Sequence, residues 1–198
     1  LYYWTGTTGA WSTRQLVDTN GSNGDITVTS ADLPICIYND SGVKYNTRSG
    51  GTWANEETVT TYAAGYSGNK LVVDSADNVH VVWNEVIAGY VAIEYRMRTS
   101  GVWGREQSVV SGTIDDYGYP LVGVDSSDNV YIVYQYDRLT AQAETVWYKR
   151  VNSEVVGEEI VLDSEATQPN SYPSTYAYLW HRFPTSGILP PGESPTCL

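Results

Sequence analysis

The chain has 198 residues and a formal net charge of −12, with 17 tyrosines and 7 tryptophans but a single phenylalanine. A chain this acidic argues against nucleic acid or an anionic membrane surface as partner, and no apolar run approaches the ~20 residues of a membrane span. The length fits one domain with a substantial core, and tyrosine and tryptophan suit half-exposed strands, where one end of the ring meets water.

Residues 1–17 contain two short apolar stretches, from Leu1 to Trp4 and from Trp11 to Val17. Both match the later parts of the units that follow, so we expect them to form the third and fourth strands of a sheet. Because the chain starts with leucine rather than methionine, we expect that a leader has been removed or that the chain lies within a longer protein.

Three units follow at about 26–60, 70–110 and 121–162, and each is expected to form four short strands. The second unit is the clearest: its first strand at 70–73 leads through an Asp/Ser/Asn-rich segment at 74–78 into a β-branched second strand. Asp, Ser and Asn bond their own backbone and tolerate bends, so this segment predicts a tight turn within a hairpin.

An aromatic residue followed by a polar one recurs at the end of β-branched runs. The four pairs are Tyr38-Asn39, Trp83-Asn84, Tyr134-Gln135 and Trp180-His181. A second mark, a tyrosine followed by Gly-x-Trp, recurs out of phase, and Val155-Val156 replaces Gly-x-Trp in its last copy. Self-similarity at roughly 40–50 residues without helical periodicity is the signature of propeller blades. The sequence therefore predicts an all-β fold, a β-propeller of four-stranded antiparallel blades.

The end of the chain complements its beginning. Residues of about 174–183 have the pattern of a first and a second strand, which the N-terminal half-unit lacks. Joined in one sheet, the two halves make a fourth blade and remove exposed strand edges. We therefore predict a four-bladed ring within residues 1–183, the alternative being an arc of a six- or seven-bladed propeller. The Pro- and Gly-rich residues 184–198 are expected to form a tail.

Cys36 and Cys197 are the only cysteines. A disulfide between them would tie the tail across the ring and close a long loop. The alternative is two unrelated thiols, with Cys36 packed as a small core residue.

Two segments, 93–103 and 124–131, resemble the repeats of sialidase-like β-propellers, which carry bacterial-neuraminidase (Asp-box) repeats. The first begins Ile93-Glu94-Tyr95-Arg96, and the second contains Asp125-Ser126-Ser127-Asp128-Asn129. The resemblance covers about residues 1–180 at the level of single blades. The Asp-box reads Ser-x-Asp-x-Gly-x-x-Trp, whereas the turns at 49–53 and 100–103 keep glycine and tryptophan but lack the aspartate. The arginines give no recognisable substrate-binding triad, so the resemblance implies the fold and not the catalysis.

Polar and aromatic residues gather in the loops between second and third strands and between units, which share one end of a propeller. Rigid blades with variable loops are the usual arrangement of binding surfaces. Carboxylate, amide and guanidinium groups beside aromatic rings suit a sugar, which offers hydroxyls and apolar C–H faces. The candidate ligand-binding residues are Asn84, Glu85, Tyr90, Tyr117, Tyr119, Gln135, Tyr136, Asp137, Arg138 and His181. The alternative is that each of them is a solvated loop residue or packs at the rim.

Other chemistry receives less support from the sequence. A glycosidase needs two carboxylates about 5–10 Å apart, for which the candidates are Glu85, Asp115, Asp116, Asp137 and Glu144. The repeated Asp-x-x-Asp-Asn turns at 74–78 and 125–129 offer oxygen ligands for calcium, but a structural turn explains them without a metal. His80 is expected to be a strand residue rather than a ligand. We therefore expect no metal and no cofactor.

The sequence favours an extracellular or cell-surface module that binds carbohydrate or mediates adhesion without catalysis, with a glycan or cell-surface polysaccharide as partner. Few lysines and many Tyr, Gly, Ser and Thr residues support that location. The first alternative is a sialidase-like glycoside hydrolase or polysaccharide lyase. The second is a structural repeat module of a larger surface or filament protein.

Overall fold

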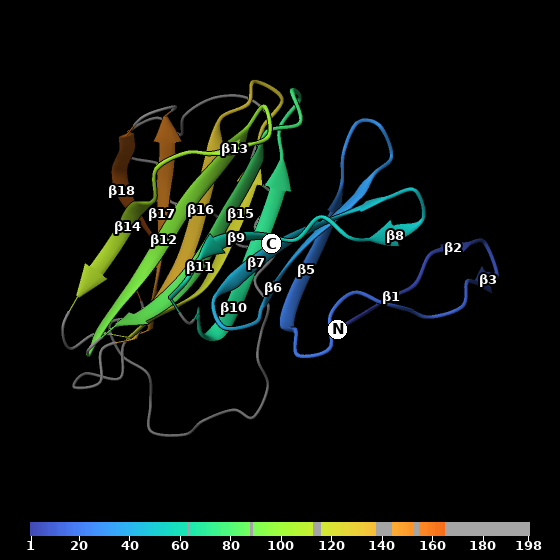
Figure 1. Cartoon of the computed structure of the whole chain (residues 1–198). Coiled ribbons are helices and arrows are strands. Elements are labelled where there is room, and N and C mark those ends of the chain that lie inside the picture. Colours follow the sequence, from blue (N-terminus) through green and yellow to red (C-terminus); the bar gives the residue numbers. More distant parts are fainter. Residues whose placement is uncertain (63, 88, 113–115, 138–143, 153–154, 165–198) are drawn as a thin grey trace. The chain divides into compact units, whose positions relative to one another are not determined.

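Strands are the only regular elements in the described part of the chain (Figure 1), which confirms the all-β prediction. The computed structural model describes residues 1–62, 64–87, 89–112, 116–137, 144–152 and 155–164. Among these residues no helix has the length and hydropathy to cross a membrane.

The N-terminal residues form two short antiparallel pairs, as expected for the last strands of a sheet. β1 (Tyr2–Tyr3) pairs with β4 (Gln15–Leu16), and β2 (Gly6–Thr7) pairs with β3 (Ala10–Trp11).

Three larger antiparallel sheets follow in chain order. The first sheet consists of β5 (Ser22–Val28), β6 (Pro34–Asn39), β7 (Val43–Ser49), β8 (Thr52–Trp53) and β9 (Glu57–Thr60). The second sheet consists of β10 (Ala64–Val73), β11 (Val79–Ile87), β12 (Tyr90–Thr99), β13 (Val102–Trp103) and β14 (Gln107–Gly112). The third sheet consists of β15 (Asp116–Val124), β16 (Val130–Asp137), β17 (Glu144–Asn152) and β18 (Val155–Ser164). In each sheet the first, second and third strands are neighbours in chain order, which matches the predicted units.

The core lies between consecutive sheets, because side chains alternate between the two faces of a strand. From β11, Val81 and Trp83 pack with Ile35 and Tyr45 of the first sheet. The intervening Val82 belongs instead to the cluster that contains Ile132 and Tyr134 of the third sheet. β11 is therefore covered on both faces, which explains why the adjacent residues Val81, Val82 and Trp83 are all apolar.

Two inter-sheet contacts repeat and explain the Gly-x-Trp mark. Trp53 packs edge-on against Tyr3, and Trp103 packs edge-on against Tyr45, with ring centroids 5.2 and 5.5 Å apart. Each tryptophan has an arginine of its own sheet nearby: Arg48 lies over the ring of Tyr3 and Arg98 over that of Tyr45. Since the N-terminal pair supplies Tyr3 where the first sheet supplies Tyr45, residues 1–17 occupy the place of a preceding third and fourth strand.

The turns between first and second strands are joined from sheet to sheet. The N–H and hydroxyl of Ser30 donate to the carboxylate of Asp77 at 2.7 and 2.6 Å. Ser75 donates in the same way to Asp128, at 2.9 and 2.6 Å. These bonds hold equivalent turns together, so the three sheets run in the same sense. We call this the turn end, and the opposite end, with the hairpins between second and third strands, the loop end.

Several predictions concern residues outside the described part of the chain. The chain divides into two units, residues 1–168 and 169–198, and the second unit lies wholly outside the described residues. The closing strands at 174–183, the tail at 184–198 and the disulfide to Cys197 therefore stay predictions, as does the number of blades. Among the described residues Cys36 has no disulfide partner, and burial raises the pKa of its thiol to about 12.

Candidate functional site

The first strand of each large sheet is interrupted by a bulge near the loop end. In β5 the register shifts between Ser22 and Asp25, and in β15 it shifts between Gly118 and Leu121. In β10 the shift lies between Ala64 and Asn69. Each bulge lies next to the aromatic-polar pair of the second strand, because Tyr38, Trp83 and Tyr134 fall at these register positions. Bulges re-aim side chains and are frequent beside active sites.

One residue of each bulge has a left-handed backbone. The three positions are equivalent in the repeat, with φ of 49° at Asn23, 87° at Gly68 and 51° at Tyr119. Glycine and asparagine tolerate this conformation, whereas a bulky side chain costs about 1–2 kcal/mol there. Tyr119 is the one aromatic residue with positive φ in the described part of the chain, and 62% of its surface is exposed. Core packing of the ring therefore does not offset the backbone strain at Tyr119. Backbone strain of this kind is typical of functional sites.

Other aromatic rings accompany Tyr119 toward the loop end. Tyr117, half-buried, packs edge-on against Tyr134 with centroids 6.1 Å apart. Tyr90, which opens β12 at the loop hairpin of the second sheet, is 55% exposed. Tyr62, between the first and second sheets, is 51% exposed. The loop end thus presents aromatic faces on supports that are fixed by strands.

The structure corrects the predicted loop positions of three candidates. Asn84, Glu85 and Gln135 lie within strands, because the β11–β12 hairpin stays paired up to Ile87 and Tyr90 and β16 continues to Asp137. Asn84 and Glu85 are each only 4% exposed. The prediction that these two lie in a loop is therefore wrong, since pairing on both sides of β11 carries the strand past the aromatic-polar pair.

Glu85 belongs to a buried carboxyl pair on the face of β11 that packs on the first sheet. The Trp83 Nε1–H donates to Glu85 Oε2 at 3.1 Å, and Glu94 is the direct cross-strand neighbour of Trp83. Burial raises the pKa of Glu85, and burial together with Glu106 and Glu85 raises that of Glu94 to about 7. One group of this pair thus retains a proton near neutral pH. Glu94 was not among the predicted site residues, although its place opposite a core tryptophan signals burial.

The third sheet brings acidic positions into one row at the loop end. Asp116 is the register partner of Asp137, and Asp137 is also that of Glu144. Tyr136 is the register partner of Tyr117. The remaining candidates Arg138, His181 and Asp115 lie outside the described residues.

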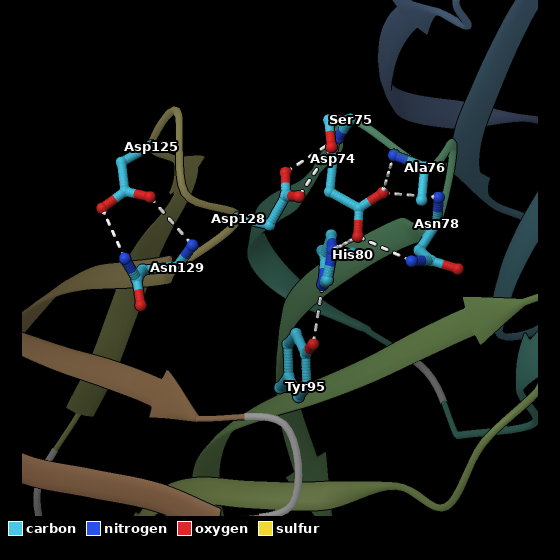
Figure 2. Close-up of polar contacts among 9 residues, drawn as sticks. All are labelled: Asp74, Ser75, Ala76, Asn78, His80, Tyr95, Asp125, Asp128 and Asn129. Carbon is cyan, nitrogen blue, oxygen red and sulfur yellow. Dashed lines mark hydrogen bonds and ion pairs between the residues drawn. The ribbon is translucent and has the colours of Figure 1, made fainter.

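The turn end, in contrast, is accounted for by its own hydrogen bonds (Figure 2). Burial opposes ionisation of Asp74, but bonds from Asn78, His80 and Ala76 hold its pKa below the usual value. Burial lowers the pKa of His80, so its neutral ring accepts the Tyr95 O–H at Nδ1 (2.7 Å) and donates from Nε2 to Asp74 (3.3 Å).

The next repeat uses Tyr131 in place of His80. The Tyr131 O–H donates directly to Asp125 at 2.7 Å. His80 is therefore a strand residue that bonds the turn, as predicted. Among the described residues no three His, Cys, Asp or Glu side chains are grouped to hold a metal ion.

Comparisons with known proteins identify the architecture. No family model matches the chain, and a search of curated proteins finds no significant match. Among solved structures, the chain is similar to an α-L-arabinofuranosidase from Fusarium graminearum in complex with an iminosugar inhibitor, with a TM-score of 0.59 and 9% identity over 74% of this chain and 50% of that chain. It is also similar to an ulvan lyase of a new polysaccharide lyase family, with a TM-score of 0.54 and 10% identity over 73% of this chain and 43% of that chain.

The fold is a β-propeller fold. The chain spans half or less of the length of these two proteins. The propeller part of the resemblance drawn from the sequence is therefore confirmed, while its sialidase part has no specific support and stays a hypothesis.

Proposed function

We propose that the chain carries a non-catalytic saccharide-binding site at the loop end of its propeller. The observation that carries this proposal is Tyr119, an exposed aromatic residue held in a left-handed bulge where the equivalent residues are asparagine and glycine. A sugar ring stacks its C–H face on an aromatic ring, and nearby polar groups take its hydroxyls.

Two further observations support a saccharide as the ligand. The exposed rings of Tyr62 and Tyr90 accompany Tyr119 toward the loop end, so an extended polymer has more than one ring to contact. The two structures of similar fold are, by name, an arabinofuranosidase and an ulvan lyase, both of which belong to carbohydrate chemistry. We retain an extracellular or cell-surface location as part of the proposal, because such polymers lie there.

Affinity gel electrophoresis tests the proposal with four soluble polysaccharides: arabinan, xylan, mannan and ulvan. Wild-type protein is expected to be retarded by at least one of them, and the Tyr119→Asn variant is expected to lose most of that retardation. Asn23→Gly, at the equivalent bulge of the first sheet, is the matched control and should migrate like wild type. No retardation of wild type by any of the four polymers, or full retardation of Tyr119→Asn, contradicts the proposal.

A glycoside hydrolase or lyase is the second candidate function. The row of Asp116, Asp137 and Glu144 favours it, because register partners in a sheet lie about 5 Å apart at Cβ and a glycosidase needs two carboxylates about 5–10 Å apart. Release of reducing sugar or of unsaturated product from the same four polymers, abolished in Asp137→Asn, would favour the enzyme over the binding module.

A further inference from the structure

The polar residue of each aromatic-polar pair has a different hydrogen-bonding environment in each repeat. Asn39 of the first sheet accepts a 2.5 Å hydrogen bond at Oδ1 from Asn69 Nδ2 of the second sheet. Asn84 is the equivalent residue of the second sheet, and the residue equivalent to Asn69 in the third sheet is Pro120. Proline has no side-chain donor. Accordingly Asn84 Oδ1 is buried without a hydrogen-bond partner among the described residues.

The aromatic residues of the same pairs differ in the same way: two of them have an acceptor for their side-chain donor and the third has none within the described residue ranges. The Tyr38 O–H donates to Glu56 at 2.7 Å, and the Trp83 N–H donates to Glu85 at 3.1 Å. The hydroxyl of Tyr134, the equivalent residue of the third sheet, has no partner in the described part of the chain, although Tyr134 is only 1% exposed. Buried polar groups without partners are rare and costly, so two in equivalent parts of one repeat require an explanation.

The two groups face the same inter-sheet packing layer. Asn84 is the register partner of Ile93, and cross-strand partners project to the same face of a sheet. Ile93 and Tyr134 belong to one buried cluster between the second and third sheets. An unpaired acceptor and an unpaired donor therefore flank this layer, beside the bulge that contains Tyr119.

We infer that Asn84 and Tyr134 bind one hydroxyl group of a saccharide that stacks on Tyr119. A hydroxyl donates and accepts at once, so it satisfies the Asn84 carbonyl oxygen and the Tyr134 O–H together. A water molecule has the same chemistry, and the experiment below separates the two sources. This inference rests on the proposed function, because its ligand is the saccharide that is proposed to stack on Tyr119.

The test measures dissociation constants from electrophoretic retardation with the arabinan, xylan, mannan or ulvan that retards wild type most. Tyr134→Phe removes the donor and keeps the ring, so affinity should fall about 5–10-fold. Asn84→Leu removes the acceptor at similar volume and should give a comparable loss. Tyr38→Phe is the matched control: it deletes an O–H whose partner is Glu56, and affinity should not change.

The outcomes distinguish this inference from the proposed function. If Tyr134→Phe and Asn84→Leu bind like wild type while Tyr119→Asn does not bind, the inference alone is overturned. The position between Asn84 Oδ1 and the Tyr134 hydroxyl is then assigned to water. If no polysaccharide retards wild type, the proposed function and the inference both fail. Thermal unfolding shows which variants are folded, and affinity is compared only for those. If either Tyr134→Phe or Asn84→Leu does not fold, the other one still tests the inference.

Discussion

Burial in the second sheet changes the charge state of an individual residue, Glu94. Glu94 occupies a strand position whose direct cross-strand partner is the fully buried Trp83. Water is nearly excluded there, and the charged form of the carboxyl group is disfavoured. The same packing that buries the tryptophan therefore sets the charge of its neighbour.

Glu94 makes a pH-dependent contribution to stability. Its pKa rises from 4.5 to about 7 on folding, mainly through burial. Below pH 4.5 the group is protonated in both states and its contribution is fully present. As the pH rises toward 7, the unfolded chain loses the proton first, so this stabilisation is lost.

The Glu94→Gln variant should therefore gain stability relative to wild type between pH 5 and pH 8, by roughly 2–3 kcal/mol. Urea unfolding of both proteins at the two pH values measures the difference. An equal free-energy gap between the two proteins at both pH values contradicts the assigned pKa.

Much of the residue-level site could not be predicted from the sequence. Tyr119 was selected as an aromatic residue between units, but its positive φ depends on an extra residue in β15 relative to β16, which no local pattern marks. Asn84 was selected for its loop, yet it lies buried in a strand, because neighbouring sheets and not local composition decide where β11 ends. Glu94 is not among the predicted site residues, since it alternates with apolar residues on the same side of the strand as Arg96 and Arg98, which predicts a solvent-facing position.

Elements were predicted more fully, because strand pattern and turn chemistry are local. The Asp/Ser/Asn segments predicted the turns, and in each of them the fourth residue is left-handed, at Asp32, Asp77 and Asp128. The sequence does not predict that β11 and β16 continue past their aromatic-polar pairs, since the pairing there depends on neighbouring strands and not on local sequence.

The β6–β7 hairpin depends on one glycine. Gly42 has φ of 132°, and a Cβ added there would collide with the carbonyl oxygen of Thr60. The Gly42→Ala variant should therefore lose about 2 kcal/mol or more of unfolding free energy, because backbone strain adds to a collision with backbone.

Gly123→Ala is the control for this substitution. Gly123 lies in β15 with no atom within 4 Å of an added Cβ. Its variant should be as stable as wild type or slightly more so. Equal unfolding free energies of the two variants in urea would show that the hairpin does not depend on Gly42.

The whole molecule is held by contacts that repeat from sheet to sheet. Serine-aspartate bonds join the turns, and tyrosine-tryptophan pairs join the outer parts of the sheets. Within the described residues, β1 pairs with β4 alone, so its other edge has no strand beside it. We expect residues of about 174–183 to supply that strand and close the ring.

A designed disulfide tests this closure. Ile37 is the register partner of Tyr45, and Tyr3 and Leu179 are the equivalent residues at the two ends of the chain. The variant with Tyr3→Cys and Leu179→Cys, in a Cys197→Ser background, should oxidise to one intramolecular disulfide. Loss of the two introduced thiols, with the Cys36 thiol retained and no change in mass to dimer, is the expected result. An intact pair of thiols after mild oxidation supports the open arc.

The central claim is that the strained left-handed backbone at Tyr119 serves ligand binding and not folding. Paired measurement of unfolding free energy and polysaccharide affinity in Tyr119→Asn tests it most directly. The account predicts that the variant gains about 0.5–1 kcal/mol of stability, because asparagine tolerates the left-handed backbone, while affinity falls at least tenfold. A variant that binds like wild type, or that is less stable than wild type, would contradict it.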